Sequence, residues 1–196
     1  MNPALVLLPS PLTGPSVWRA VAAALPGPVI EMPRPGQPPQ TSDEVLAWFL
    51  GAIAPDEDVI LVAHSNGGLY VPPLTARRQV AGSVFVDAVL PPASGQMPMI
   101  PRRFYDFIAP KADADGLLPP WTQWWDEDIY GLFPSTEVRA RMEREEPRLP
   151  LSYFLESLTV PAGWDARPGA FLAFGDTYAQ ERTRADHGRP GKANTS

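Results

Sequence analysis

The sequence predicts an α/β protein in which a parallel sheet is covered by helices. Short apolar runs, typical of strands buried on both faces, alternate with segments of helical periodicity. Such alternation favours parallel strands joined by helical crossovers. A small-residue corner around Ser65, at the end of one apolar run, indicates where a functional site lies. With 196 residues the chain is long enough for one domain with a substantial core.

The first ninety residues show the alternation most clearly. Apolar runs predict strands at 4–8, 28–32, 59–63 and 83–86. Helical spacing predicts helices at 16–25, 41–53 and 67–79. Ser16 is the expected N-cap of the first of these helices, and Asp43 and Glu44 favour the start of the second because acidic groups suit the helix dipole.

Between residues 91 and 168 the alternation stops. This segment is rich in proline and aromatic residues, and it predicts one longer helix at 135–146 and shorter helices at 101–108, 121–130 and 150–158. Because it is too long for a simple loop, we expect a helical cap that supplies an apolar pocket above the sheet. The same aromatic residues suit the cap's own core equally well.

A last strand at 170–174 and a helix at 177–186 complete the alternation. The expected organisation is therefore an α/β core at 1–90, a cap at 91–168, the last core strand with its turn and helix at 169–186, and a tail at 187–196. The tail has no apolar run and is expected to be disordered. The sheet should hold about five to six strands.

Composition narrows the classes of function. The net charge of −6 is spread along the chain, which argues against nucleic-acid and membrane partners. The absence of cysteine and the presence of only two histidines argue against a metal site, and no cofactor is expected. The apolar N-terminal run is too short for a signal peptide or membrane span, which predicts a cytoplasmic protein. A small molecule is the expected binding partner, and the oligomeric state is left open.

The corner around Ser65 carries the functional prediction. The apolar run at 58–63 stops at His64-Ser65, and Asn66-Gly67-Gly68 leads into an apolar stretch that can be helical. This pattern predicts a strand, a sharp turn and a helix with one serine at the apex. A serine held there is exposed and points away from its own sheet, which is where a hydrolase places its nucleophile.

The chain resembles the α/β-hydrolase superfamily over residues 4–176. The resemblance rests on this corner, on Val84–Asp87 in the next strand, and on Phe174–Asp176 at the end of the last strand. The resemblance implies that Ser65 is the nucleophile and that the Asn66 N–H is one oxyanion donor. It implies that Asp176 is the acid that orients a histidine base.

The identity of that base follows from the order of the triad. In this superfamily the order is serine, acid, histidine, so the base must follow Asp176, and His187 is the candidate. Asp87 is an alternative acid, although a structural role at the strand end is the competing interpretation. His64 is interpreted as a histidine packed beneath the elbow.

Two departures from the family pattern bear on activity. The family's first strand usually ends in His-Gly, and an N–H just after it is the second oxyanion donor. Here Pro9–Leu12 stands in that place, and Pro11 has no N–H to donate. The Leu12 N–H or the Ser10 hydroxyl is the expected substitute.

The second departure is the short segment after Asp176. Only twenty residues follow it, so the family's last strand and its histidine turn are expected to be missing, as in a C-terminally truncated chain. The leading hypothesis is serine-dependent hydrolysis of a small ester, amide or thioester through an acyl-enzyme. The alternative is a catalytically impaired binding protein or a truncated remnant. Lyase or cyclase chemistry on the same fold is a third hypothesis, by analogy only.

Overall fold

A computed structural model of the chain describes residues 2–126 and 129–187 and contains a five-stranded parallel sheet. The sheet order is β2-β1-β3-β4-β7. The strands are β1 (Ala4–Leu8), β2 (Val29–Glu31), β3 (Asp58–Ser65), β4 (Gln79–Ala88) and β7 (Gly169–Leu172). Their parallel pairing confirms the predicted fold class.

The strands at the centre of the sheet are the most deeply buried. Val6 and Leu8 on β1 and Val59 and Leu61 on β3 have no exposed surface, as expected where helices cover both faces. Leu8 of β1 pairs with Ala63 of β3, and Ser65 pairs with Ala88 of β4. The carboxyl ends of these three neighbouring strands therefore meet at one edge of the sheet, and this edge holds Ser65.

Four helices accompany the sheet: α1 (Arg19–Ala24), α2 (Ser42–Ala52), α3 (Val71–Thr75) and α6 (Ala179–His187). Thr41 caps α2 by accepting a hydrogen bond from the Glu44 N–H. The predicted capping role of Ser16 is wrong, because the chain enters this helix through a 3₁₀ turn at Pro15–Trp18. The predicted helix at 67–79 is also shorter: a 3₁₀ turn at Asn66–Tyr70 precedes α3, and β4 already begins at Gln79.

Among its described residues, the segment between β4 and β7 contains two α-helices and a small antiparallel sheet. The predicted helices at 101–108 and 135–146 are present as α4 (Arg102–Ile108) and α5 (Thr136–Glu143). The predicted helices at 121–130 and 150–158 are wrong. The helical residues in the described parts of these stretches form only 3₁₀ turns, and β6 (Ser157–Val160), which begins within the second stretch, pairs with β5 (Gly95–Pro98). Prolines at both ends of these stretches limit helix growth.

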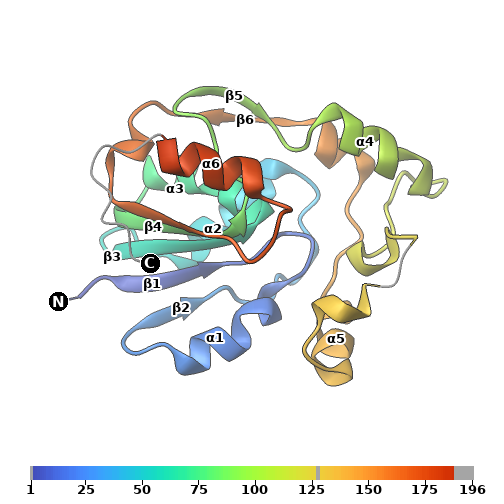
Figure 1. The fold of residues 1–196 in the computed structure, drawn as a ribbon, viewed down its shortest axis with the longest axis horizontal. Coiled ribbons are helices and arrows are strands. Elements are labelled where there is room, and N and C mark those ends of the chain that lie inside the picture. The colour runs from blue at the N-terminus through green and yellow to red at the C-terminus, as the bar shows by residue number, and fades with distance from the viewer. Residues whose placement is uncertain (1, 127–128, 188–196) are drawn as a thin grey trace.

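Figure 1 shows α4 and α5 beyond the carboxyl ends of the parallel strands. Trp124, Tyr153 and Phe154 of this segment are almost fully buried and belong to the same hydrophobic core as the sheet, where the Tyr153 hydroxyl lies 2.9 Å from that of Tyr70. The interpretation of residues 91–168 as a cap over Ser65 stays a prediction. The predicted disorder of the tail falls on residues outside the described ranges, apart from the backbone of His187.

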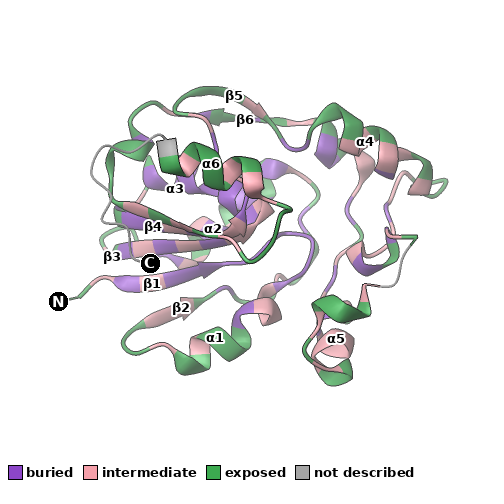
Figure 2. Ribbon diagram, viewed as in Figure 1, coloured by how far each residue is buried: buried purple, intermediate pink, exposed green. Residues whose placement is uncertain are grey.

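Burial differs between the sheet and its last helix. In Figure 2 the central strands are mostly buried, whereas α6 is mostly exposed. The strand that leads to α6 is also partly exposed, because β7 forms one edge of the sheet. Among the described residues, no helix is long and apolar enough to cross a membrane.

Candidate active site

Ser65 occupies a strained position between strand and helix. It is the last residue of β3, and its φ of 52° and ψ of −126° lie in a region that non-glycine residues rarely adopt. The 3₁₀ turn at Asn66–Tyr70 begins at the next residue. The structure thus contains the strand, sharp turn and helix that the sequence pattern predicts.

The glycines that follow Ser65 are required by close packing. A Cβ atom on Gly67 would lie 2.8 Å from the Pro9 carbonyl oxygen, and one on Gly68 would lie 2.1 Å from the Val89 carbonyl oxygen. Both contacts are with backbone, which cannot move aside as a side chain can. The Ser65 carbonyl also accepts a 3.0 Å hydrogen bond from the Val89 N–H. The turn is therefore held between the ends of β1 and β4.

The candidate oxyanion donors differ in availability. Asn66 is the first residue of its 3₁₀ turn, so its N–H has no acceptor within that turn. The Leu12 N–H donates instead to the Ser10 hydroxyl oxygen at 3.2 Å, within a loop whose residues are all buried. The Ser10 hydroxyl still has its own proton to donate.

The side-chain partner of Ser65 is Tyr178. Its hydroxyl lies 3.1 Å from Ser65 Oγ, and either oxygen can be the donor. Burial raises the pKa of Tyr178 above its usual value, and the hydrogen bond with Ser65 opposes this only in part. Tyr178 is therefore a neutral phenol near pH 7 and a poor base for the serine proton. The sequence did not reveal this contact, because a tyrosine in the turn before a helix carries no motif.

The two candidate acids lie in different surroundings. Asp176 is exposed, and no hydrogen bond to its carboxylate occurs within the described residues; only its backbone carbonyl accepts one, from the Ala179 N–H. Asp87 lies at the end of β4 with a φ of 38°, and its carboxylate accepts a 3.0 Å hydrogen bond from the Phe174 N–H. Asp87 therefore connects the ends of β4 and β7.

The negative charge of Asp87 also reaches the elbow. It favours the protonated forms of both groups, so it opposes the burial that lowers the pKa of His64 and adds to the burial that raises the pKa of Tyr178. No such influence of Asp176 on these two groups is seen. Of the two carboxylates, Asp87 thus has the stronger electrostatic connection to the elbow.

His64 is held neutral beneath the elbow. Burial lowers its pKa to about 4, although the nearby Asp87 carboxylate acts in the opposite direction. The ring meets Trp18 edge-to-face at a centroid distance of 5.9 Å. Its Nδ1 is buried and has no hydrogen-bond partner among the described residues. This environment agrees with a packed histidine.

His187 is the last residue of α6, and its side chain lies outside the described part of the structure. The start of α6 is the end near Ser65, because Tyr178 directly precedes it. A rise of about 1.5 Å per residue separates the two ends of this nine-residue helix by roughly 12 Å. In Figure 1, α6 runs back from the carboxyl edge of the sheet. The structure thus brings Ser65 and Tyr178 together, with His187 at the opposite end of α6.

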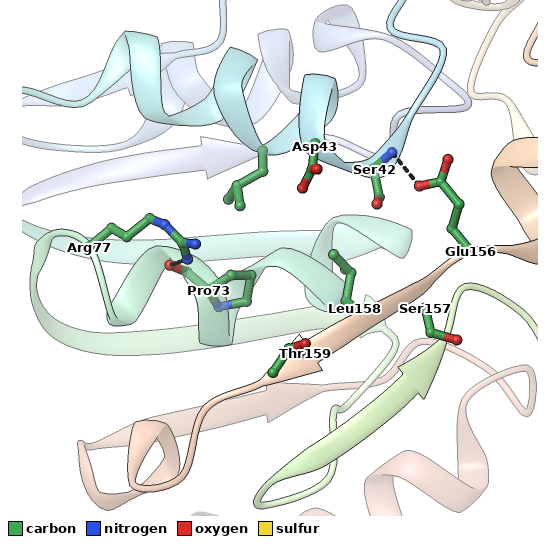
Figure 3. A pocket seen from close by; sticks show the side chains of 9 residues that line it. Ser42, Asp43, Pro73, Arg77, Glu156, Ser157, Leu158 and Thr159 are labelled. Atoms are coloured by element: carbon green, nitrogen blue, oxygen red, sulfur yellow. Dashed lines mark hydrogen bonds between the residues drawn. The ribbon is translucent and has the colours of Figure 1, made fainter.

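A separate pocket of about 400 Å³ opens between α2, α3 and β6 (Figure 3). Asp43, Arg77 and Glu156 supply its charges, and Leu46, Pro73 and Leu158 supply apolar surface. None of its lining residues belongs to the turn at Ser65. Glu156 also accepts a 2.8 Å hydrogen bond from the Ser42 N–H, so part of its carboxylate serves the start of α2. The pocket is therefore distinct from the candidate active site.

A strained serine between a parallel strand and a helix, on a sheet of this order, defines the α/β-hydrolase class. The family described as the alpha/beta hydrolase family matches residues 5–194, nearly the whole chain. The chain therefore belongs to the α/β-hydrolase family, as the resemblance in its sequence indicated. Among curated proteins, no sequence matches the chain.

Solved structures share the fold at low sequence identity. An extracellular α/β-hydrolase from a Paenibacillus species, described as similar to tobacco salicylic acid binding protein 2, is 18% identical with a TM-score of 0.68. The match covers 88% of this chain and 77% of that one. Polyneuridine aldehyde esterase is 15% identical with a TM-score of 0.60, and the match covers 95% of this chain and 87% of that chain.

A third neighbour is named for a different activity. A variant of tomato methylketone synthase I in complex with β-ketoheptanoate is 13% identical with a TM-score of 0.62, over 95% of this chain and 84% of that chain. At such identities the three likenesses establish the fold. In general terms, these likenesses and the family match support a hydrolase that acts on small molecules.

Proposed function

We propose that this chain is a serine hydrolase that acts on a small ester, amide or thioester, with Ser65 as the nucleophile. The observation that carries the proposal is the strained backbone of Ser65 at the strand–helix turn. Such strain has a cost, and it persists where the surrounding structure enforces it for a functional reason. The packing of Gly67 and Gly68 against neighbouring backbone is what enforces it here.

In the proposed reaction Ser65 Oγ attacks the substrate carbonyl carbon as its proton passes to a base. The carbonyl oxygen becomes an oxyanion that the Asn66 N–H stabilises, with the Ser10 hydroxyl or the Leu12 N–H as second donor. Loss of the leaving group gives an acyl-enzyme, and water then releases the acid. The Leu12 N–H must first release the Ser10 oxygen, so the Ser10 hydroxyl is the simpler second donor.

The base and the acid remain part of the proposal. Asp176 and His187 are the family-based candidates, and His187 must come beside Ser65, where Tyr178 lies in this structure. Asp87 is the alternative acid, supported by its electrostatic connection to the elbow. A cytoplasmic location also stays a proposal, since one structural neighbour is an extracellular protein.

A second candidate function is ligand binding without catalysis. The supporting observation is that Ser65 contacts a neutral phenol, which is too weak a base to activate it near pH 7. In that case the elbow is retained from a catalytic ancestor.

Labelling with a fluorophosphonate probe separates the two functions. A nucleophilic Ser65 should be phosphonylated in the wild-type chain, whereas Ser65→Ala should not react, and peptide mass spectrometry should place the adduct on Ser65. Hydrolysis of a short-chain nitrophenyl ester should follow the same pattern. Equal reactivity of the wild type and Ser65→Ala would refute the hydrolase and favour the binding protein.

A further inference from the structure

The connection between β7 and α6 brings one side chain inward from an otherwise exposed segment. Phe174 is 79% exposed, and residues 175–177 are also exposed. Tyr178 is instead partly buried, with its hydroxyl 3.1 Å from Ser65 Oγ. The exposed connection thus ends at a residue that contacts the candidate nucleophile.

The helix that follows Tyr178 has little apolar anchoring. None of the side chains of residues 179–186 is buried, and the sequence of α6 is mainly polar. Besides the Tyr178 contact, Arg184 donates a 2.8 Å hydrogen bond to the Leu90 carbonyl, beyond the end of β4. A helix without a buried apolar face belongs to the low-stability part of a fold and can detach while the core stays folded.

The position of Tyr178 excludes a base from the same place. At 3.1 Å the two oxygens are in direct contact, so no third group fits between them. A base that accepts the Ser65 proton needs a heavy atom within about 3.2 Å of Oγ. Tyr178 itself is neutral near pH 7, so it does not take up the serine proton in place of that base.

We propose that Tyr178 is a latch that holds Ser65 at rest, and that the site becomes competent when the 173–187 segment moves away from the elbow. The inference rests on the proposed function, because it assigns regulation to the same serine. Gly175 gives the segment a point of movement, since nothing lies within 4 Å of the place a Cβ atom would occupy there. Movement frees Oγ for a base and for the substrate carbonyl.

The test compares Tyr178→Phe, which removes only the hydroxyl, with the wild type in two measurements. The first is the rate of fluorophosphonate labelling of Ser65, which should rise about five- to tenfold, the effect of losing one hydrogen bond. The second is amide hydrogen exchange of the 178–186 segment, which should accelerate by a similar factor. Tyr105→Phe removes a phenol hydroxyl in α4 and should change neither measurement.

Ser65→Ala removes the other partner of the same hydrogen bond. It should accelerate exchange of the 178–186 segment as much as Tyr178→Phe does, and the double variant should show no further increase. A shared, non-additive effect identifies the Ser65–Tyr178 contact itself as the latch.

Each contrary result has a separate meaning. Slower labelling in Tyr178→Phe would overturn the latch, because Tyr178 would then assist the serine. Unchanged exchange in both single variants would also overturn it, whatever the labelling shows. If no variant is labelled but exchange responds as expected, the hydrolase function fails while the contact that holds the helix is confirmed.

Discussion

The carboxyl ends of β3 and β7 are built in opposite ways. At the end of β3, Ser65 has a strained backbone and its glycines lie against the backbone of two neighbouring strands. At the end of β7, Phe174 and Asp176 are exposed, and the helix that follows buries no side chain among residues 179–186. The candidate nucleophile therefore lies in a closely packed turn, whereas the candidate acid Asp176 lies in an exposed segment.

The largest effect that would test this contrast is expected from Gly68→Ala. Its Cβ atom would lie 2.1 Å from the Val89 carbonyl oxygen, so strand and turn must separate. We expect the free energy of unfolding to fall by about 3 kcal/mol, the upper end of ordinary overpacking costs. Urea unfolding at pH 7 measures the change.

Gly175→Ala is the matched control at the end of β7. Nothing lies within 4 Å of the added Cβ atom, so the change in unfolding free energy should stay within about 0.5 kcal/mol. Equal losses in the two variants would show that the two strand ends are equally constrained.

The next largest effect is the acid sensitivity that His64 gives to the elbow. Its pKa is about 4 in the folded chain, whereas the ordinary value of 6.5 applies in the unfolded chain. Between these two values the unfolded chain therefore binds the extra proton. Stability should fall as the pH drops from 6.5 to 4, by about 3 kcal/mol for this group.

The acid effect is checked by urea unfolding of the wild type and His64→Gln at about pH 7, 5.5 and 4.5, which span the window between the two pKa values. The variant cannot take up this proton, so its stability should decline less steeply over the window. Parallel declines in both proteins would place the acid sensitivity elsewhere in the chain.

A smaller effect isolates the backbone strain at Ser65. Ser65→Gly and Ser65→Ala both remove the hydroxyl and its contact with Tyr178, but only glycine adopts a φ of 52° and ψ of −126° without strain. Ser65→Gly should therefore be more stable than Ser65→Ala by about 1 kcal/mol. Thermal unfolding of the two variants gives the difference, and an equally stable alanine variant would mean that the turn is relaxed.

The smallest effect is expected at Phe174, beyond the end of β7. Its side chain is 79% exposed, so Phe174→Ser should change the free energy of unfolding by no more than about 0.5 kcal/mol. Urea unfolding again provides the measurement. A loss of about 2 kcal/mol or more, as for a buried side chain, would show that this ring anchors the exposed segment.

The core and the elbow could be predicted from the sequence because local patterns determine them. Apolar runs identified the five strands of the parallel sheet, and the small residues at positions 66–68 identified the turn after the third of them. The β5–β6 pair was missed because Gly95–Pro98 shows no alternation and its partner lies about sixty residues later. Long-range pairing of short, irregular strands leaves little signal in one sequence.

The contacts of the candidate site were less predictable than its position. The approach of Tyr178 to Ser65 depends on the path of the chain from β7 to α6, and no spacing rule encodes this path. The greater electrostatic influence of Asp87 than of Asp176 likewise depends on how the ends of β4 and β7 are joined. Side-chain partners across separate loops are properties of the tertiary structure.

The backbone contacts of the elbow have a consequence for how the family can diversify and be engineered. The turn at Ser65 packs against the backbone of Leu8, Pro9 and Val89, all of which precede the long segment at residues 91–168 in the chain. These backbone contacts do not involve that segment, whereas Tyr70 at the end of the same turn shares a 2.9 Å hydrogen bond with its Tyr153. We expect a chimera that carries another hydrolase's segment to keep the strained backbone of Ser65 when it also keeps the partner of Tyr70.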